Sequence, residues 1–267
     1  RTVEVDAVSD DVREAFVGGR GLGLWLLWRS TAPSTSWSDP DNAIVFSPGP
    51  LAGVPQVSGS GKAAVVTLSP ATALPVDSSV GGHLGPLLLA CGLDALAIRG
   101  QAPGTVIVVI DGLDRRARVC DADTVPADTP ALAEAVARRW AEEYPAADLS
   151  VVSAGRAASH ASIACLNVSH FDRRRGEFRH RQAGRGGIGH AVRTGPYLGQ
   201  RVTVDGPEYS TCAALGTNCG IFDPAWVVEA NHYCDAYGVD TISFGGVCAF
   251  AMECWERGVL DAPRTGG

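Results

Sequence analysis

Glycine-rich stretches constrain this chain more than any other feature of its sequence. Residues 183–189 read AGRGGIG, with four glycines and one arginine in seven positions. Glycine lets the backbone approach a ligand closely, and bare N–H groups beside an arginine form a cradle for an anion. Similar stretches occur at residues 18–23 (GGRGLG), 58–66 (SGSGKAAVV) and 81–86 (GGHLGP). A surface turn explains any one of them, but together they predict a strand-rich domain that holds a large, phosphate-bearing ligand.

Composition narrows the class of protein. The 267 residues are 46% hydrophobic, which is enough for one large domain or two smaller ones with a sizeable core. The formal net charge of −7 argues against a nucleic-acid or anionic-membrane surface. The basic residues that lead into the 183–189 stretch are local, and they fit a solvated loop as well as a phosphate clamp.

The eight cysteines indicate free thiols in a reducing compartment. They form no C-x-x-C pair and fit no zinc spacing, so we predict no metal ligands among them. Most lie in apolar segments, which favours buried thiols and a cytoplasmic location. No signal peptide or long apolar span is evident. The sequence begins with Arg1, so the natural start is expected to lie upstream.

The pattern of apolar residues predicts an α+β fold. We expect strands at 2–8, 43–46, 62–68, 95–99, 105–110, 117–120, 148–153 and 161–168, with a hairpin turn at Asp111-Gly112. We expect helices ending at Phe16 and at Cys91, and others over 22–28, 129–144, 207–215, 224–237 and 241–257. Near Asp205 the spacing of apolar residues changes from the alternation of strands to the period of helices. The predicted division is a strand-rich domain at 1–193 and a helical domain at 205–267.

Several familiar motifs are rejected. Gly184-x-Gly186-x-x-Gly189 matches the dinucleotide fingerprint as a string, but no strand pattern precedes it. Gly61-Lys62 lacks the other glycine and the hydroxyl residue of a P-loop. There is no G-x-S-x-G elbow and no HExxH pair. A lone histidine in a glycine loop is more often structural, and His83 is the strongest functional candidate among the six histidines.

A series of motifs in order carries a family resemblance over nearly the whole chain. They are GGRGLG, the AVVTLSP strand, GGHLGP followed by GLDALAIRG, AGRGGIG, GPEYSTCAALGTNCGIFD, and CDAYGVDTISFGG followed by AFAMECWERG. The chain therefore resembles the aldehyde ferredoxin oxidoreductase family. The resemblance implies a strand-rich domain that cradles a tungsto- or molybdo-bispterin, covered by helical domains. It also implies oxidation of an aldehyde to a carboxylic acid, with a [4Fe–4S] cluster passing electrons to ferredoxin.

Carried over by motif, the resemblance assigns site residues. The positions that match pterin contacts are Lys62, Ser79, Gly81, Gly82, Arg181, Ala183, Gly184, Arg185, Gly186, Gly187, Asp235 and Asp240. The two aspartates belong to DAYGVD, which is similar to the family's D-x-x-G-L-D element. Gly238 lies between them and is a candidate helix C-cap at a turn around a ligand. Candidate catalytic residues are Ser210, Glu208 and His83.

The departures from the family pattern are equally specific. The family's C-x-x-C-x-x-x-C motif and its carboxy-terminal helical part, with a fourth cluster cysteine and an active-site histidine, have no counterpart in the sequence. This chain therefore does not support a [4Fe–4S] cluster. Ser210 replaces a glutamate and cannot act as a carboxylate acid or base. Lys62 replaces an arginine, which keeps the charge but loses the bidentate fork, and Ser79 replaces an asparagine.

Two explanations compete for these departures. Either the chain is part of a longer protein, or it is a reduced family member that has lost its metal chemistry. Three functions follow: a pterin-binding oxidoreductase acting on a small molecule with ferredoxin as partner, a cofactor-free enzyme that cyclises or isomerises a small hydrophobic metabolite, and a non-catalytic binding subunit. A homodimer is compatible with each. No partner that is a nucleic acid or a membrane is expected.

Overall fold

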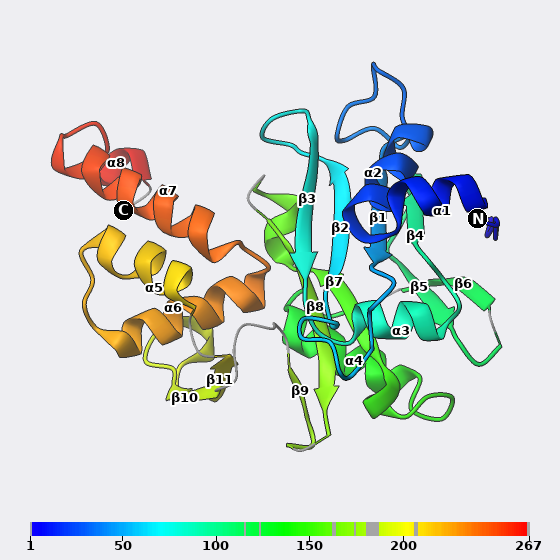
Figure 1. Cartoon of the computed structure of the whole chain (residues 1–267). Helices are drawn as coiled ribbons and strands as arrows, with labels where there is room; N and C mark the ends of the chain where they lie inside the picture. The colour runs from blue at the N-terminus through cyan, green and yellow to red at the C-terminus, as the bar shows by residue number, and fades with distance from the viewer. Residues whose placement is uncertain are drawn as a thin grey trace. The chain divides into compact units, whose positions relative to one another are not determined.

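The computed structural model describes residues 2–114, 116–122, 124–161, 164–173, 175–179, 187–205 and 208–265. Figure 1 shows the helices and strands coloured in chain order. Contacts between Cα atoms divide the chain into two units. Unit 1 comprises residues 1–125 and 147–151, and unit 2 comprises residues 126–146 and 152–267. The chain therefore leaves unit 1, contributes one segment to unit 2, and returns before it completes unit 2. The two units are described separately below.

Unit 1 is built on a four-stranded antiparallel sheet in the order β3-β2-β1-β4. The strands are β1 (Ala43–Pro48), β2 (Ala63–Leu68), β3 (Pro75–Val80) and β4 (Leu96–Arg99). The central strands β1 and β2 are runs of β-branched and other apolar residues, which suits a sheet whose inner strands are covered. Pro48 ends β1, because the following Gly-Pro sequence cannot continue a ladder.

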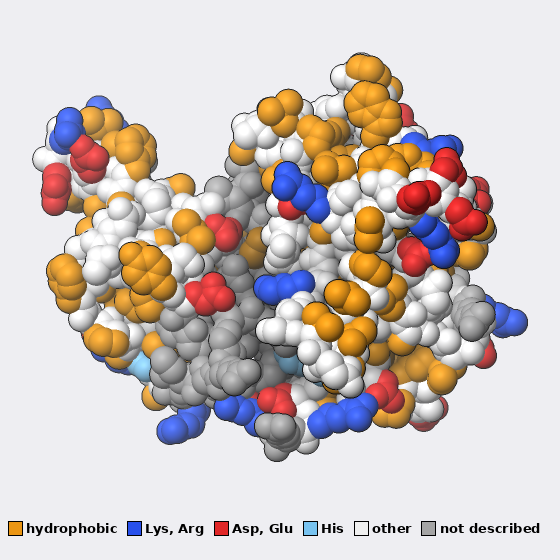
Figure 2. Space-filling model, in the orientation of Figure 1, with side chains coloured by type: hydrophobic (Ala, Val, Ile, Leu, Met, Phe, Trp, Pro, Cys, Tyr) orange, Lys and Arg blue, Asp and Glu red, His pale blue; other side chains and the backbone are white. Residues whose placement is uncertain are grey.

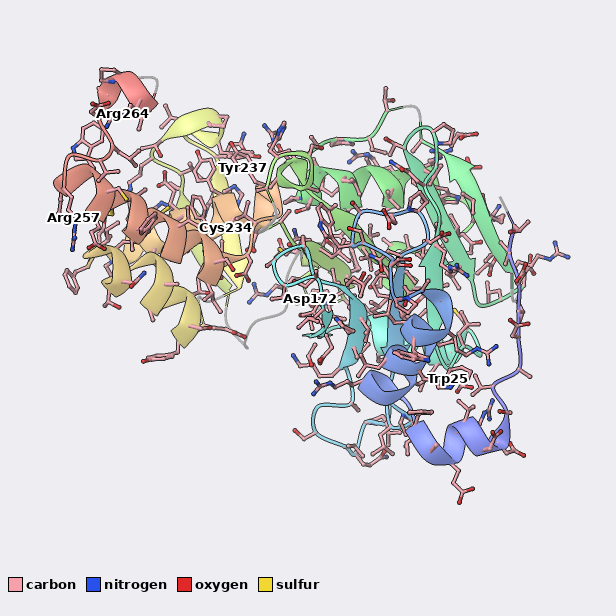
Figure 3. All side chains as sticks on the ribbon, turned by 90° about the horizontal axis from the view of Figure 1, so that it is seen from above. Trp25, Asp172, Cys234, Tyr237, Arg257 and Arg264 are labelled. Atoms are coloured by element: carbon pink, nitrogen blue, oxygen red, sulfur yellow. The ribbon has the colours of Figure 1, made fainter. Side chains whose placement is uncertain are left out.

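Helix α2 (Gly19–Ser30) packs on this sheet after the short helix α1 (Asp10–Phe16). Leu27 of α2 joins Val45 of β1 and Val66 of β2 in a core cluster whose members are at most 9% exposed. Gly23 allows the contact, since a Cβ there would lie only 2.6 Å from Cγ2 of Val66. Trp25, labelled on α2 in Figure 3, stacks under the Arg29 guanidinium at 5.0 Å.

Two further elements complete unit 1. Helix α3 (Leu84–Ala90) follows the GGHLGP stretch and contacts β1. Strands β5 (Val106–Asp111) and β6 (Arg116–Asp121) form an antiparallel hairpin. The Asp111 carboxylate accepts hydrogen bonds from the backbone N–H groups of Leu113 and Asp114, which is the local bonding that makes aspartate common at turns.

Unit 2 combines small sheets with helices. Strands β7 (Ser150–Ala154), β8 (Leu166–Asp172) and β9 (Glu177–Arg179) form one sheet, of which the first two residues of β7 are counted with unit 1. Strand β10 (Gly187–Ala191) pairs with β11 (Arg201–Asp205) in another sheet. Helix α4 (Thr129–Arg139) begins with Pro130 at its first turn. Thr129 is fully buried, and its hydroxyl donates a 2.7 Å hydrogen bond to the backbone carbonyl of Asp235.

The remaining helices are α5 (Tyr209–Leu215), α6 (Pro224–Tyr237), α7 (Thr241–Glu256) and α8 (Ala262–Thr265). Leu215 of α5 packs with Val227 and Cys234 of α6, the latter labelled in Figure 3. The Thr211 and Thr241 hydroxyls are 2.9 Å apart and join the beginnings of α5 and α7. Single 3-10 turns occur at Ala146–Asp148, Arg156–Ser159, Gly195–Tyr197 and Thr217–Cys219.

The structure confirms the predicted α+β class, but several predicted elements are wrong. Residues 2–8 form no strand: they alternate in polarity, yet they are almost entirely exposed and pair with no described strand. The strand expected at 161–168 begins instead at Leu166, after a 3-10 turn and an isolated bridge at Ala164. The helix expected over 129–144 ends at Arg139. Strands β3, β9, β10 and β11 were not predicted.

The predicted division at 193–205 differs from the division by contacts, because unit 2 also contains residues 126–146 and 152–193. The prediction divides the chain by its type of secondary structure, whereas the contacts divide it by packing. The predicted boundary is therefore not tested and stays a prediction. Within the described residues no helix is both long and apolar enough to cross a membrane.

Candidate functional site

The sequence-predicted cofactor residues of unit 1 gather at one corner of the sheet. Strand β2 pairs with β3 so that Ala63 lies opposite Val80 and Ala64 opposite Ser79. Lys62 immediately precedes β2, and Gly81 and Gly82 immediately follow β3, so all of them lie at the same end of this pair. Lys62 and Ser79 are exposed. The structure therefore brings together four residues that are up to twenty positions apart in sequence.

Close backbone contacts fix this corner. A Cβ on Gly61 would lie 2.9 Å from the carbonyl oxygen of Gly82, and one on Gly85 would lie 3.2 Å from the carbonyl oxygen of Lys62. The backbone of Lys62 is thus held between the segments on either side of His83. His83 itself lies just before α3 and is exposed. An ammonium and a hydroxyl presented from rigid backbone form a donor set that fits a phosphate group.

The predicted residues of unit 2 lie near the beginnings and ends of three helices. Asp235 is 8% exposed on the last turn of α6, and its Oδ2 accepts a 3.0 Å hydrogen bond from Asn231 Nδ2. Asp240 caps α7 by accepting a 2.8 Å hydrogen bond from the Ser243 N–H. Glu208 is exposed at the N-cap of α5, and Ser210 is half-buried in its first turn. Carboxylates of this kind are acceptors that fit the N–H groups of a pterin ring.

The turn between Asp235 and Asp240 has the conformation that the sequence predicts. Gly238 is the C-cap of α6 with φ 71° and ψ 48°, the left-handed region that favours glycine. A Cβ there would lie 2.7 Å from the Gly155 N, so the turn also touches the segment after β7. The Gly238 carbonyl accepts a hydrogen bond from the Cys165 N–H at 2.9 Å. Contacts from two preceding segments therefore hold the DAYGVD turn in place.

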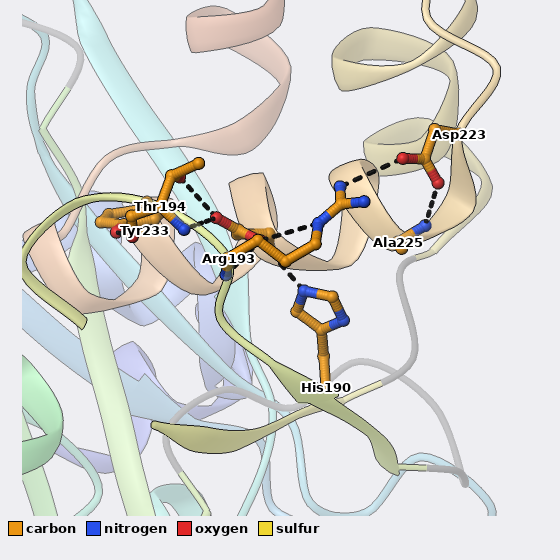
Figure 4. A network of polar contacts seen from close by, with 7 residues as sticks. His190, Arg193, Thr194, Asp223, Ala225 and Tyr233 are labelled. Atoms are coloured by element: carbon orange, nitrogen blue, oxygen red, sulfur yellow. Dashed lines mark hydrogen bonds and ion pairs between the residues drawn. The ribbon is translucent and has the colours of Figure 1, made fainter. Parts of the chain in front are cut away.

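Sequence reasoning missed Glu229, a side chain of unit 2 that accepts several hydrogen bonds from described residues (Figure 4). Its Oε1 accepts hydrogen bonds from the Thr194 N–H at 3.0 Å and the Thr194 hydroxyl at 2.6 Å. Its Oε2 lies 3.0 Å from the Arg193 N, 3.5 Å from Arg193 Nε and 3.0 Å from His190 Nε2. Arg193 also pairs with Asp223, the N-cap of α6, at 3.0 Å. The cluster ties the end of β10 to helix α6.

The protonation of Glu229 follows from these contacts. Burial raises the pKa of Glu229, since the residue is only 5% exposed, but hydrogen bonds from Thr194, His190 and Arg193 outweigh burial and lower that pKa to about 2. The carboxylate is therefore charged and saturated with donors. One signal was available in the sequence: Glu229 stands alone among apolar residues in PAWVVEA, and a carboxylate in such a stretch needs partners.

An aromatic cluster adjoins this network. The rings of Tyr197 and His232 meet edge to face at 5.0 Å, and Tyr233 and Tyr237 complete the group. Tyr233 donates a hydrogen bond from its hydroxyl to the Thr194 carbonyl. Burial lowers the pKa of His232 and raises that of Tyr197, so both rings stay neutral near pH 7. These groups reinforce the packing of α6.

Several predicted residues cannot be placed. Arg181, Ala183, Gly184, Arg185 and Gly186 lie outside the described residues, and Gly187 is placed only as the first backbone position of β10. The expectation that residues 81–86 and 183–189 line one cavity therefore stays a prediction. Within the described ranges no three His, Cys, Asp or Glu side chains are grouped to hold a metal ion. The eight cysteines are in the thiol form, and Cys219 and Cys234 are buried.

The fold defines the class of an α+β protein. Taken separately, unit 1 carries an ammonium and a hydroxyl that suit a phosphate, and unit 2 carries two aspartates at helix ends. Sequence profiles make the class specific. The profile described as "Aldehyde ferredoxin oxidoreductase, N-terminal domain" matches residues 1–194, and "Aldehyde ferredoxin oxidoreductase, domains 2 & 3" matches residues 183–267. The chain belongs to the aldehyde ferredoxin oxidoreductase family.

Individual relatives agree with this membership. The chain is 25% identical to a tungsten-containing aldehyde ferredoxin oxidoreductase of Pyrococcus horikoshii and 26% identical to one of Thermococcus kodakarensis, with 100% and 99% of the chain covered. It spans 58% of the length of each. It is also 39% identical over 75 residues, or 28% of the chain and 12% of the relative, to an aliphatic sulfonate oxidoreductase subunit of Pyrococcus furiosus described as WOR-like.

A solved structure shares the fold. The chain is similar to the active-site complex BamBC of benzoyl coenzyme A reductase with 1,5-dienoyl-CoA, with a TM-score of 0.74 and 17% sequence identity. The similarity covers 98% of this chain and 55% of that one. The match confirms the α+β architecture over almost the whole chain.

Proposed function

We propose that this chain is the cofactor-binding part of a tungsten-dependent oxidoreductase that oxidises an aldehyde to a carboxylic acid. Family membership supports this, as does the name that the Pyrococcus and Thermococcus relatives share. The observation that carries the proposal is the corner at the end of β2 and β3. There, Lys62, Ser79, Gly81 and Gly82, which were assigned to the cofactor from sequence alone, lie together on rigid backbone.

The residues of this chain would bind and orient the cofactor. Lys62 and Ser79 would donate hydrogen bonds to a phosphate, and Asp235 and Asp240 would accept them from pterin N–H groups. A tungsto-bispterin, when bound, supplies the two-electron redox chemistry that converts an aldehyde and water to a carboxylic acid. The two electrons would pass to ferredoxin. A cytoplasmic location and a homodimer are part of the same proposal.

Proton transfer is the step on which this chain departs from the family pattern. Ser210 lacks the carboxylate of the family glutamate, and Glu208, two positions earlier at the N-cap of α5, is exposed. We propose Glu208 as the group that takes or gives the proton. A Glu208→Gln variant would then lose turnover while it retained bound pterin.

Elemental analysis of the native protein tests the proposal. Protein purified without oxygen would be analysed for tungsten, molybdenum, iron and labile sulfide, and for pterin released by denaturation. About one tungsten and two pterins per chain are expected for a loaded bis-pterin site. Absence of metal and pterin, in protein that turns over a non-redox substrate, would replace this proposal with the cofactor-free enzyme. Stoichiometric iron with a reduced-cluster paramagnetic signal would show ligands beyond those in this sequence.

A further inference from the structure

One face of the β2–β3 pair carries a row of polar side chains. Val66 lies opposite Asp77 and Ala64 opposite Ser79, and residues paired in this way point to the same face of the sheet. Alternation along each strand extends this face to Lys62. Asp77 and Ser79 therefore occupy successive rungs on one face, and Lys62, one position before β2, follows them toward the end of the sheet.

Arg20 reaches this face from helix α2. Its Nε lies 2.9 Å from Oδ1 of Asp77. The same face receives α2, because Gly23 sits directly against Val66. Helix α2 begins at the end of the sheet where Lys62 lies: a Cβ on Gly18 would be 3.2 Å from the Pro48 carbonyl oxygen, and Pro48 pairs with Ala63. Figure 2 shows basic side chains (blue) over the surface that β3 occupies in Figure 1.

The charges at this corner remain available for a ligand. The Arg20 side chain is 70% exposed and contacts Asp77 through Nε, so most of its surface is accessible to a ligand. No described residue bonds the Lys62 ammonium or the Ser79 hydroxyl. Two cations and one carboxylate leave a net positive charge beside a hydroxyl donor. This is a suitable set for an anion with several oxygens.

The fork of Arg20 supplies what Lys62 lacks. A guanidinium donates two parallel hydrogen bonds to a phosphate, whereas an ammonium acts as a point charge. Position 62 is a lysine, so no bidentate donor is present there. Arg20 lies on the same face, beside Asp77, which pairs with Val66 four positions along the chain from Lys62, and Asp77 orients the guanidinium.

We propose that Arg20 is a phosphate-binding side chain of this corner and acts together with Lys62 and Ser79. The ligand group is a phosphate monoester or diphosphate. Its identity as the phosphate of a pterin cofactor rests on the proposed function, whereas the donor arrangement does not. Asp77 is a positioning residue, because it holds the guanidinium through Nε and leaves the terminal nitrogens for the ligand.

Binding of inorganic pyrophosphate to purified protein at low ionic strength tests this proposal by titration calorimetry. Arg20→Ala is expected to weaken binding about tenfold or more, since a charge-assisted hydrogen bond contributes roughly 1.5–3 kcal/mol. The affinity of Arg20→Lys should lie between those of the wild type and Arg20→Ala. Asp77→Asn should weaken binding less than Arg20→Ala does. Arg29→Ala is the matched control: Arg29 is an exposed arginine in the last turn of the same helix. It should bind as the wild type does.

Equal affinities of the Arg20→Ala and Arg29→Ala proteins would overturn the proposal, as would a wild-type protein that does not bind pyrophosphate. If the protein is purified with pterin already bound, the pterin retained per chain replaces pyrophosphate affinity as the measurement. Pyrophosphate binding that depends on Arg20, in protein free of tungsten and pterin, would support the phosphate site and refute the proposed oxidoreductase function. Full pterin content in both Arg20→Ala and Arg29→Ala would refute the role of Arg20 and leave the proposed function intact.

Discussion

The Glu229 cluster of unit 2 and the Lys62 corner of unit 1 are both polar, but they differ in where their bonding capacity is used. Glu229 is buried, and its two oxygens are saturated by Thr194, Arg193 and His190. Lys62 and Ser79 are exposed, and no described residue bonds their side-chain polar atoms. A saturated polar group builds structure, whereas an exposed donor on rigid backbone can serve a ligand.

Removal of the buried carboxylate should have the largest effect on stability. We expect Glu229→Ala to lower the free energy of unfolding by about 3–5 kcal/mol, because the donors of Arg193, Thr194 and His190 would lose their common acceptor. Urea denaturation followed by circular dichroism would measure this. Glu253→Ala is the control, since Glu253 forms a surface pair with Arg257 one turn away and should change stability by less than about 0.5 kcal/mol. Equal losses in the two variants would refute the comparison.

The DAYGVD turn offers the next largest effect. Gly238→Ala should cost about 2–4 kcal/mol, because it adds strain at positive φ to a clash with the backbone of Gly155. Gly258→Ala separates the two causes: Gly258 has φ 70° but open space around a Cβ. It should cost only about 1 kcal/mol. If both substitutions cost the same in thermal and urea unfolding, the close approach to Gly155 contributes nothing.

Acid should weaken unit 2 through Glu229. The pKa of Glu229 is about 2 in the folded chain, below its ordinary value of 4.5. A depressed carboxyl pKa contributes stability that is present above pH 4.5 and is lost as the pH falls toward 2. The full loss should be about 3 kcal/mol for this group, at roughly 1.36 kcal/mol for each unit by which its pKa is lowered. In urea titrations between pH 6 and 2.5, the free energy of unfolding should fall less steeply with pH in Glu229→Gln than in the wild type. The same pH dependence in both proteins would contradict the assignment.

The Lys62 corner should show the smallest effect on stability. Lys62→Ala and Ser79→Ala should each change the free energy of unfolding by less than about 0.5 kcal/mol, because neither side chain is buried or bonded by a described residue. The same variants should lose pyrophosphate or pterin. A large loss of stability in either would show that the corner is structural, and the contrast between the two regions would disappear.

Sequence reasoning predicted those elements whose pattern is set by neighbours along the chain. Helices α1, α2, α6 and α7, the β5–β6 hairpin and the Gly238 C-cap all have local signals of this kind. Strand β3 has none: PVDSSV is an edge strand with mostly exposed side chains, and its pairing with β2 defines it. The alternation at residues 2–8 has the opposite property, a strand-like pattern without a described partner strand.

The site was likewise predictable only where local motifs identify its residues. Motifs assigned Lys62, Ser79, Gly81 and Gly82, and the β2–β3 register brings them together. The Glu229 cluster could not be assembled from sequence, because its donors lie 35 to 39 positions away and depend on how β10 meets α6. Arg20 was part of a recognised glycine motif, yet its role depends on Asp77, a residue of a strand that the pattern does not reveal.

The hydrogen bond from Thr129 to the Asp235 carbonyl has a consequence for synthesis on the ribosome. The two residues are 106 positions apart, and α4 packs against α6 in unit 2. At about 5–20 residues per second, α4 emerges roughly 5–20 s before its binding helix exists. During that interval Thr129, fully buried in the finished fold, lacks the Asp235 carbonyl to which its hydroxyl donates. Helix α4 therefore stays accessible to proteases and chaperones until the carboxy-terminal helices have been synthesised.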